Sequence, residues 1–214
     1  MTVKENLNRI LKEIKNYTPK IIAVTKYYDI NKMIEAYEAG LRDFAESRVL
    51  EGTLKINKMD DTLRVQSLYH FIGHLQTNKV KTAVGVFDYI HSVDSLKTAR
   101  NIDLEASKKG IVQKVLIQVN NAKEPQKFGI EPCNLENLIN GIQKMHNVEL
   151  MGLMNIAPLT DDVKELGRLF SDMRKLKERY NLKELSMGMS HDYKIALDNG
   201  STMIRLGRIL FEGI

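Results

Sequence analysis

The stretch "KIIAVTKYYDINKMIEAYEAGLRDFA" (residues 20–45) contains one complete strand, helix and strand unit, and it decides the fold. Residues 21–25 are apolar or β-branched throughout, as in a strand that is buried on both faces. Apolar residues then recur at helical spacing as far as Gly40, which predicts an amphipathic helix with Asp29 as its N-cap. A second strand follows at residues 42–45. The stretch therefore predicts two parallel strands joined by a helical crossover.

The same alternation of strand and helix patterns continues to the end of the chain. Strands are predicted at residues 21–25, 42–45, 68–72, 86–91, 114–120, 149–156, 184–189 and 202–206. Parallel strands covered by helices form either a closed (β/α)₈ barrel or an open doubly wound sheet, and eight strands favour the barrel. Because no linker rich in Pro, Gly or Ser interrupts the pattern, we expect one domain over residues 1–214.

An additional helix is predicted before the first strand. Thr2 and Glu5 have the spacing of a capping box, and apolar residues follow at helical spacing. The chain after the last predicted strand is too short for a full eighth helix. We therefore expect this N-terminal helix to cover the seam where the first and last strands meet.

The composition is typical of a soluble globular protein, with 43% apolar and 28% charged residues. A single cysteine, Cys133, excludes an internal disulfide and indicates a reducing compartment. The N-terminal segment has charges among its apolar residues, unlike a signal peptide, and no segment approaches the ~18 apolar residues of a membrane span. We expect a cytoplasmic protein with no membrane partner.

The net charge of +5 does not indicate nucleic-acid binding, because 32 basic residues are interleaved with 27 acidic ones. His70 and His74 have the spacing of metal ligands on a helix, but His70 lies in a predicted strand and Gly73 interrupts regular structure between them. We expect neither a nucleic-acid partner nor a metal site.

Lys26 stands directly after the first strand. In (β/α)₈ barrels the chemistry occurs at the C-terminal ends of the strands, and phosphate groups bind in the loops after strands seven and eight. An amine at that end is a nucleophile that can condense with an aldehyde to form a Schiff base. The plainer alternative is a strand-end lysine that extends into water.

The last quarter of the chain contains residues that can surround a phosphate group. They are the hydroxyls of Ser190, Ser201 and Thr202, the backbone N–H groups near Gly207 and Arg208, and the cation of Arg205. Such clusters also form ordinary turns and salt bridges. A Schiff-base lysine that faces a phosphate site is, however, the combination that pyridoxal phosphate requires.

Nine motifs follow one another along the chain: "IIAVTKY", "FAESR", "YHFIGHLQTNKVK", "IHSVDS", "VLIQVN", "KFGI", "GLMNIAPLTDD", "LSMGMSHDYKIAL" and "GSTMIRLGRILFEG". In this order they resemble the pyridoxal phosphate homeostasis protein family, whose members are single-domain relatives of the alanine racemase barrel. The resemblance implies an alanine-racemase-like (β/α)₈ barrel that holds pyridoxal 5'-phosphate as a Schiff base. It also implies a role in vitamin B6 homeostasis without established catalytic turnover.

The resemblance further implies roles for single residues. Lys26 corresponds to the Schiff-base residue, and Arg205 corresponds to a contact with the phosphate or the pyridine nitrogen. Phosphate contacts are implied for Ser190, Ser201, Thr202 and the backbone of Gly207 and Arg208. An arginine opposite the pyridine nitrogen would keep it unprotonated, which makes the ring a weak electron sink.

The motif "FAESR" departs from the family pattern, which usually has Gly, Glu and Asn. Ala45 and Ser47 stand at the Gly and Asn positions. The asparagine ordinarily faces the cofactor, so the shorter Ser47 is expected to bind it more weakly or through water.

Three functions remain open from the sequence: a non-catalytic cofactor carrier, an amino-acid racemase, and a Schiff-base aldolase without cofactor. A racemase needs a second acid/base residue, usually from an added domain, for which the predicted barrel leaves no residues. An aldolase needs a carboxylate or tyrosine near Lys26, and the candidates are Glu46 and Tyr27. We predict the carrier, a monomer or weak homodimer whose partners are pyridoxal phosphate and apoenzymes that use it. Whether Lys127 holds a second cofactor molecule stays open.

Overall fold

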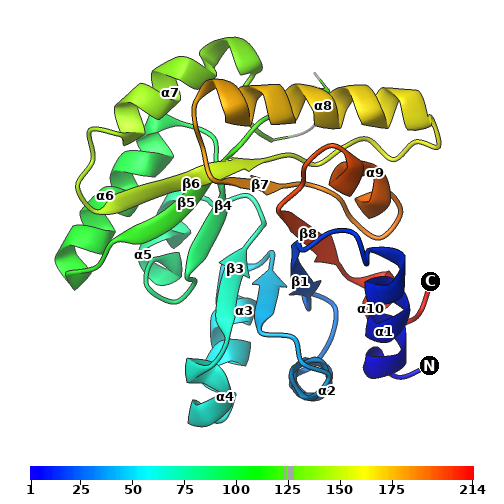
Figure 1. Cartoon of the computed structure of the whole chain (residues 1–214). Coiled ribbons are helices and arrows are strands. Elements are labelled where there is room, and N and C mark those ends of the chain that lie inside the picture. The colour runs from blue at the N-terminus through cyan, green and yellow to red at the C-terminus, as the bar shows by residue number, and fades with distance from the viewer. Residues whose placement is uncertain (123, 125–127) are drawn as a thin grey trace.

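The computed structural model describes residues 1–122, 124 and 128–214, so the question of Lys127 lies outside the described residues. Eight parallel strands close into a barrel in chain order, with helices on its outer side (Figure 1). The strands are Lys20–Val24 (β1), Asp43–Glu46 (β2), Leu68–Phe71 (β3), Tyr89–Val93 (β4), Gln113–Gln118 (β5), Val148–Met154 (β6), Glu184–Ser186 (β7) and Met203–Leu206 (β8). The predicted (β/α)₈ barrel is confirmed.

Helices and short helical turns connect these strands. They are Val3–Glu13 (α1), Ile30–Glu38 (α2), Val49–Asn57 (α3), Asp61–Val65 (α4), Thr77–Lys79 (η1), Val80–Ala83 (α5), Leu96–Lys109 (α6), Pro132–Asn134 (η2), Leu135–Ile142 (α7), Val163–Arg179 (α8), Tyr193–Asp198 (α9) and Arg208–Phe211 (α10).

The two predicted helix N-caps are present. The capping box of Thr2 and Glu5 occurs at α1, and the Asp29 side chain accepts a hydrogen bond from Lys32 N at α2. Both caps supply acceptors for backbone N–H groups that the first turn leaves unpaired.

The fourth strand begins later than its sequence pattern indicates. The prediction was residues 86–91, whereas β4 is Tyr89–Val93. Val84 and Phe87 form an isolated bridge around Gly85, whose φ of 75° lies in the left-handed region and turns the chain. Val86 and Phe87 are therefore apolar turn residues that precede the strand.

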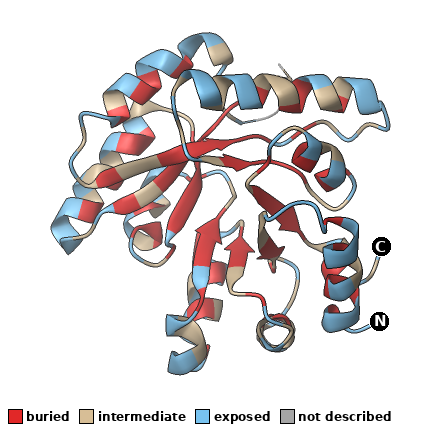
Figure 2. Ribbon diagram, in the orientation of Figure 1, coloured by how far each residue is buried: buried red, intermediate tan, exposed pale blue. Residues whose placement is uncertain are grey.

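The core has two layers, and the strands of the barrel are mostly buried along their length (Figure 2). The outer layer fills the space between strands and helices, with Phe44, Phe71 and Phe170 among its fully buried side chains. The inner layer lies within the barrel and includes Ile22 and Leu116. Side chains fill the barrel along this inner layer, so ligands have access at the strand ends.

Helix α1 covers the seam of the barrel, as expected. Asn6 Nδ2 donates to the carbonyl of Leu210 at 3.0 Å, and Arg9 donates to that of Gly213 at 3.0 Å. On the other side, Val3 N donates to Glu35 of α2 at 2.9 Å. Helix α1 thus lies between α2, which follows β1, and α10, which follows β8, and the two termini lie near each other (Figure 1).

Two histidines, His70 on β3 and His91 on β4, are fully buried. Burial lowers the pKa of both below the ordinary histidine value of 6.5, and it lowers that of His91 further. Both are therefore neutral in the native protein at pH 7.

We predict that these histidines destabilise the protein in mild acid. Because their native pKa values are lowered, the unfolded chain binds more protons, so the stabilisation is complete above pH 6.5 and is lost as the pH falls. Each histidine contributes a slope of at most about 1.4 kcal/mol per pH unit to the free energy of unfolding. Urea unfolding at several values between pH 7.5 and about pH 5.5 measures this slope.

His91→Gln should reduce the slope of the free energy of unfolding against pH, whatever its effect on stability at pH 7.5. An unchanged slope in His91→Gln would contradict the prediction.

Candidate functional site

A cavity of about 1020 Å³ opens at the C-terminal ends of the strands. Its size suits a cofactor or small-molecule ligand. Six of the eight predicted site residues line it, namely Lys26, Ser47, Ser190, Arg205, Gly207 and Arg208. Segments from both ends of the chain thus meet at one cavity because β1 pairs with β8.

Ser201 and Thr202 lie elsewhere, which corrects their predicted role. The Ser201 hydroxyl donates to the carbonyl of Met187 at 2.7 Å, and Thr202 Oγ1 accepts from Leu185 N at 2.8 Å. Both residues precede β8, so they lie at the N-terminal end of this strand, whereas the cavity lies at its C-terminal end. Their hydroxyls connect β7 and β8 and do not contribute to a phosphate site.

Lys26 follows β1 and is half-buried at the cavity wall. Its Nζ lies 4.9 Å from the centroid of the Tyr27 ring. Within the described part of the chain, its amine forms no ion pair and no hydrogen bond. The amine is therefore available to a ligand in the cavity.

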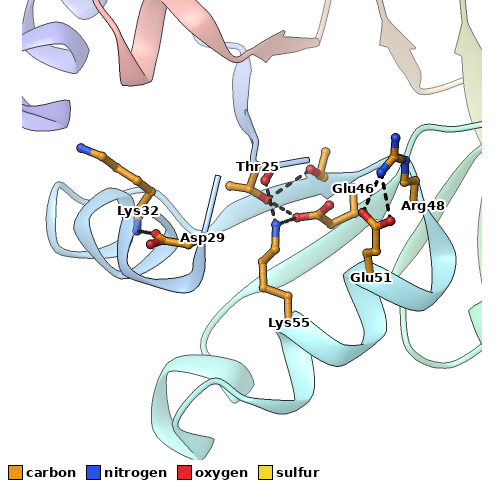
Figure 3. Close-up of polar contacts among 8 residues, drawn as sticks. Thr25, Asp29, Lys32, Glu46, Arg48, Glu51 and Lys55 are labelled. Atoms are coloured by element: carbon orange, nitrogen blue, oxygen red, sulfur yellow. Dashed lines mark hydrogen bonds and ion pairs between the residues drawn. The ribbon is translucent and has the colours of Figure 1, made fainter. Parts of the chain in front are cut away.

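A second lysine, Lys55 of α3, lies behind the end of β1 and is fully engaged (Figure 3). Its Nζ contacts Glu46 Oε1 at 2.6 Å and donates to the carbonyl of Thr25 at 2.8 Å. The Thr25 hydroxyl donates to the same Glu46 oxygen at 2.7 Å. These three residues, which we call the Glu46 cluster, hold the peptide that precedes Lys26.

Arg205 of β8 is a buried cation, only 3% exposed, at the cavity wall. Its Nη1 donates to the carbonyl and the hydroxyl of Ser186, both at 2.7 Å, and its Nη2 donates to the carbonyl of Asn155 at 2.7 Å. Burial lowers the pKa of Arg205 to about 10, so it stays charged at pH 7. No carboxylate among the described residues forms an ion pair with it. A buried cation held only by neutral acceptors favours an anionic or electron-rich ligand group beside it.

Ser190 joins the loop after β7 to the turn after β8. Its Oγ accepts a hydrogen bond from Ile209 N at 3.4 Å, which places it beside Gly207 and Arg208. The loop is held by Asp192, whose Oδ1 accepts from Met189 N at 2.5 Å. A hydroxyl and backbone N–H groups thus meet at the same wall of the cavity, as in sites that bind phosphate.

Ser47 is held in place by a close approach of two loops. A Cβ atom at Gly73 would lie 2.0 Å from the Ser47 carbonyl oxygen and 2.7 Å from its carbonyl carbon. Residue 73, two positions after the end of β3, must therefore be glycine for the backbone of Ser47 to keep its position.

We predict that Gly73→Ala both destabilises the protein and weakens ligand binding. Because the added methyl group meets backbone rather than a flexible side chain, we expect a loss of about 2 to 3 kcal/mol in the free energy of unfolding. The matched control is Gly167→Ala in α8, where nothing lies within 4 Å of the added Cβ and helix propensity favours alanine. Urea unfolding of the two variants tests the prediction, which fails if Gly73→Ala is as stable as wild type.

Several site features were not indicated by the sequence. Lys55 lies on α3, which has only nine residues and was not predicted. Asn155 and Ser186 accept hydrogen bonds from Arg205. A polar residue at the end of a buried strand is the sequence pattern that could have indicated them as site residues. The segment 156–159 also lines the cavity. His191 is exposed at the rim of the cavity, with Nε2 3.4 Å from Asp192 Oδ2.

Two further findings concern the part of the chain that the structure describes. No cluster of His, Cys, Asp and Glu side chains with the arrangement of a metal site occurs there. None of the helices there combines the length and hydrophobicity that crossing a membrane requires.

Comparison with known proteins agrees with this barrel. The family model described as alanine racemase, N-terminal domain, matches residues 2–213, which defines the class of barrel. The pyridoxal phosphate homeostasis protein of Aquifex aeolicus is 36% identical over 226 residues, covering 99% of this chain and 98% of that protein. The chain therefore belongs to the pyridoxal phosphate homeostasis protein family.

Solved structures show the same relationship. PipY of Synechococcus elongatus, determined with PLP bound, is 34% identical and superposes with a TM-score of 0.86 over 98% of this chain and 99% of its own. Alanine racemase of Clostridium difficile is 18% identical, with a TM-score of 0.77, and only 56% of its chain is covered. The similarity to alanine racemase, at 18% identity, concerns the fold alone.

Proposed function

We propose that this protein binds pyridoxal 5'-phosphate through a Schiff base with Lys26 and holds the cofactor for vitamin B6 homeostasis. The observation that carries the proposal is an unpaired amine and a buried guanidinium at one cavity. Lys26 follows β1 and Arg205 lies on β8, and these strands pair with Ile22 opposite Arg205. PipY, a relative of nearly the same length, was solved with PLP bound.

The residues at the cavity fit the chemical groups of this cofactor. Ser190 and the N–H groups at Gly207 and Arg208 would hold the phosphate, and Lys26 would hold the aldehyde carbon. Arg205 would lie toward the ring, and Ser47 would contact the cofactor with its hydroxyl. When bound, the cofactor supplies an aldehyde and a conjugated ring that accepts electrons.

The same residues offer little support for proton transfer, which a racemase or aldolase requires. The Glu46 carboxylate is engaged by Lys55 and Thr25. Tyr27 is 78% exposed. Burial and the nearby Glu212 raise the pKa of Tyr28 to about 12, so its phenol stays protonated and is a weak base at pH 7. These contacts favour a carrier over an enzyme.

We further propose that the chain acts as a single domain over residues 1–214, as a monomer or weak homodimer in the cytoplasm. Its cavity is open enough to release the cofactor to apoenzymes that need it. The support comes from the composition and from the open end of the barrel.

Titration of the cofactor-free protein with pyridoxal 5'-phosphate tests the proposed function. We expect a visible absorption band that saturates at one equivalent. Incubation of the loaded protein with a panel of L-amino acids should then leave their optical rotation unchanged. Absence of the band would contradict cofactor binding, and rapid loss of optical rotation would show an amino-acid racemase instead.

A further inference from the structure

A row of polar side chains crosses the interior of the barrel from the cavity toward its opposite end. It begins at Arg205 Nη1, which donates to Ser186 Oγ at 2.7 Å. Ser186 Oγ lies 3.0 Å from His91 Nδ1, and His91 Nε2 lies 2.9 Å from His70 Nδ1. His70 Nε2 lies 2.9 Å from Asp43 Oδ1. The row connects side chains from five strands, β8, β7, β4, β3 and β2.

The chemistry of its two ends determines the direction of every hydrogen bond. A carboxylate can only accept, so His70 carries its proton on Nε2, donates it to Asp43 Oδ1 and leaves Nδ1 as an acceptor. His91 must then carry its proton on Nε2 and donate it to His70 Nδ1. His91 Nδ1 is thereby the acceptor for the Ser186 hydroxyl, whose oxygen accepts from the guanidinium of Arg205. Each histidine is therefore restricted to one neutral tautomer.

Packing fixes the histidine rings in the orientation that the row requires. His70 stacks on Tyr89, with ring centroids 4.8 Å apart and an interplanar angle of 10°. The His70 and His91 rings meet edge to face at 73°. Both rings are wholly buried, so neither can turn without disturbing the inner core.

Such a row is costly to bury unless each polar group is satisfied, and apolar side chains would fill a barrel core at lower cost. Its end at Arg205 gives the row a role at the site, because Arg205 lines the cavity and its hydrogen bonds go to neutral acceptors. The Asp43 carboxylate, at the other end, supplies the negative charge that aligns all the intervening dipoles.

We propose that Ser186, His91 and His70 are positioning residues, which hold the guanidinium of Arg205 in the orientation that a ligand in the cavity meets. The row acts on a bound cofactor only through Arg205, and this effect on the cofactor rests on the proposed function. The restriction of each histidine to one tautomer does not depend on cofactor binding, so it can be measured in the cofactor-free protein.

Long-range ¹H–¹⁵N NMR of the histidine rings tests the row directly. Both His70 and His91 should be protonated on Nε2 in the wild type. In Asp43→Asn the side-chain amide can donate to His70 Nε2, so the acceptor that fixes the direction of the row is lost and both histidines should show a mixture of tautomers. A wild-type His91 protonated on Nδ1, or tautomers unchanged by Asp43→Asn, would overturn the proposal.

The effect on the cofactor is tested with Ser186→Ala. We expect its dissociation constant for pyridoxal 5'-phosphate to rise about tenfold, because a hydrogen bond to a charged group is lost. The visible absorption maximum of the bound cofactor should also shift, which a merely structural role would not cause. Ser186→Thr, which keeps a hydroxyl, should restore both values.

The matched control is Ser92→Ala. Ser92 is equally buried beside His91 on β4, but its Oγ has no hydrogen-bond partner in the described structure. Its loss should leave the tautomers and the absorption maximum unchanged. If Ser186→Ala lowers only the melting temperature, with the dissociation constant and the absorption maximum as in Ser92→Ala, the positioning role is refuted. If the wild type binds no cofactor, the proposed function fails, while the NMR result still decides whether the row exists.

Discussion

Lys26→Ala should give a protein that develops no Schiff-base absorption band when it is titrated with pyridoxal 5'-phosphate. The amine of Lys26 forms no ion pair or hydrogen bond at the cavity wall, and its removal leaves no lysine among the described residues that line the cavity to form the Schiff base. Contacts with the phosphate remain, so weak binding without the visible band is expected. We expect the dissociation constant to rise at least about a hundredfold, or about 2.7 kcal/mol.

Lys79→Ala is the matched control for this prediction. Lys79 lines a smaller pocket of about 270 Å³ that adjoins the cavity at Ser47. If the Schiff base is specific to Lys26, Lys79→Ala should keep the full absorption band. A yellow Lys26→Ala protein whose colour matches that of the wild type would contradict the assignment.

Lys55→Met should cause the largest loss of stability among the site variants. It leaves the Glu46 carboxylate, 3% exposed, without its cation. Breaking a buried ion pair from one side typically costs about 3 to 5 kcal/mol. For a chain of this length we expect the melting temperature to fall by about 10 °C. Thermal unfolding followed by circular dichroism measures the change.

The Glu46 cluster should also affect cofactor binding, because Lys55 holds the carbonyl of Thr25, next to Lys26. Changing both partners, as in Lys55→Met with Glu46→Leu, removes the unpaired charge and should recover most of the stability. Thr25 Oγ1 keeps an acceptor in the carbonyl of Ala45, at 3.3 Å. Cofactor binding should stay weakened in the double variant, because the Thr25 carbonyl still lacks its donor.

An exposed ion pair provides the comparison for the stability measurement. Lys175 pairs with Asp172 on α8, and their side chains are 68% and 42% exposed. Lys175→Met should cost less than about 1 kcal/mol, since water solvates the remaining carboxylate. If Lys55→Met melts as close to the wild type as Lys175→Met does, the Glu46 cluster does not have the proposed role.

The strand pattern was sufficient to predict the barrel because each buried parallel strand has a short apolar run of its own. Once the barrel was predicted, residues just after strands, such as Lys26 and Ser190, could be assigned to the cavity end. Ser201 and Thr202 were misplaced by the same reasoning. They precede β8 by one or two residues, and composition alone does not show at which end of a strand a Ser-Thr pair lies.

Long-range partners were beyond the reach of sequence patterns. His70 was considered with His74, four residues away, whereas its partner in the barrel is His91 on the next strand. Lys55 was missed because its ion pair with Glu46 depends on how α3 packs behind β1 and β2. Pairing of this kind follows from closure of the barrel, which no local spacing encodes.

Borohydride reduction of the cofactor-loaded protein, followed by proteolysis and mass spectrometry, tests the central claim most directly. Reduction converts a Schiff base into a stable bond, so the modified lysine can be identified in its peptide. We predict one pyridoxyl phosphate group per chain, on the peptide that contains Lys26. A label mainly on Lys55, on Lys79 or on scattered surface lysines, or no label at all, would contradict it.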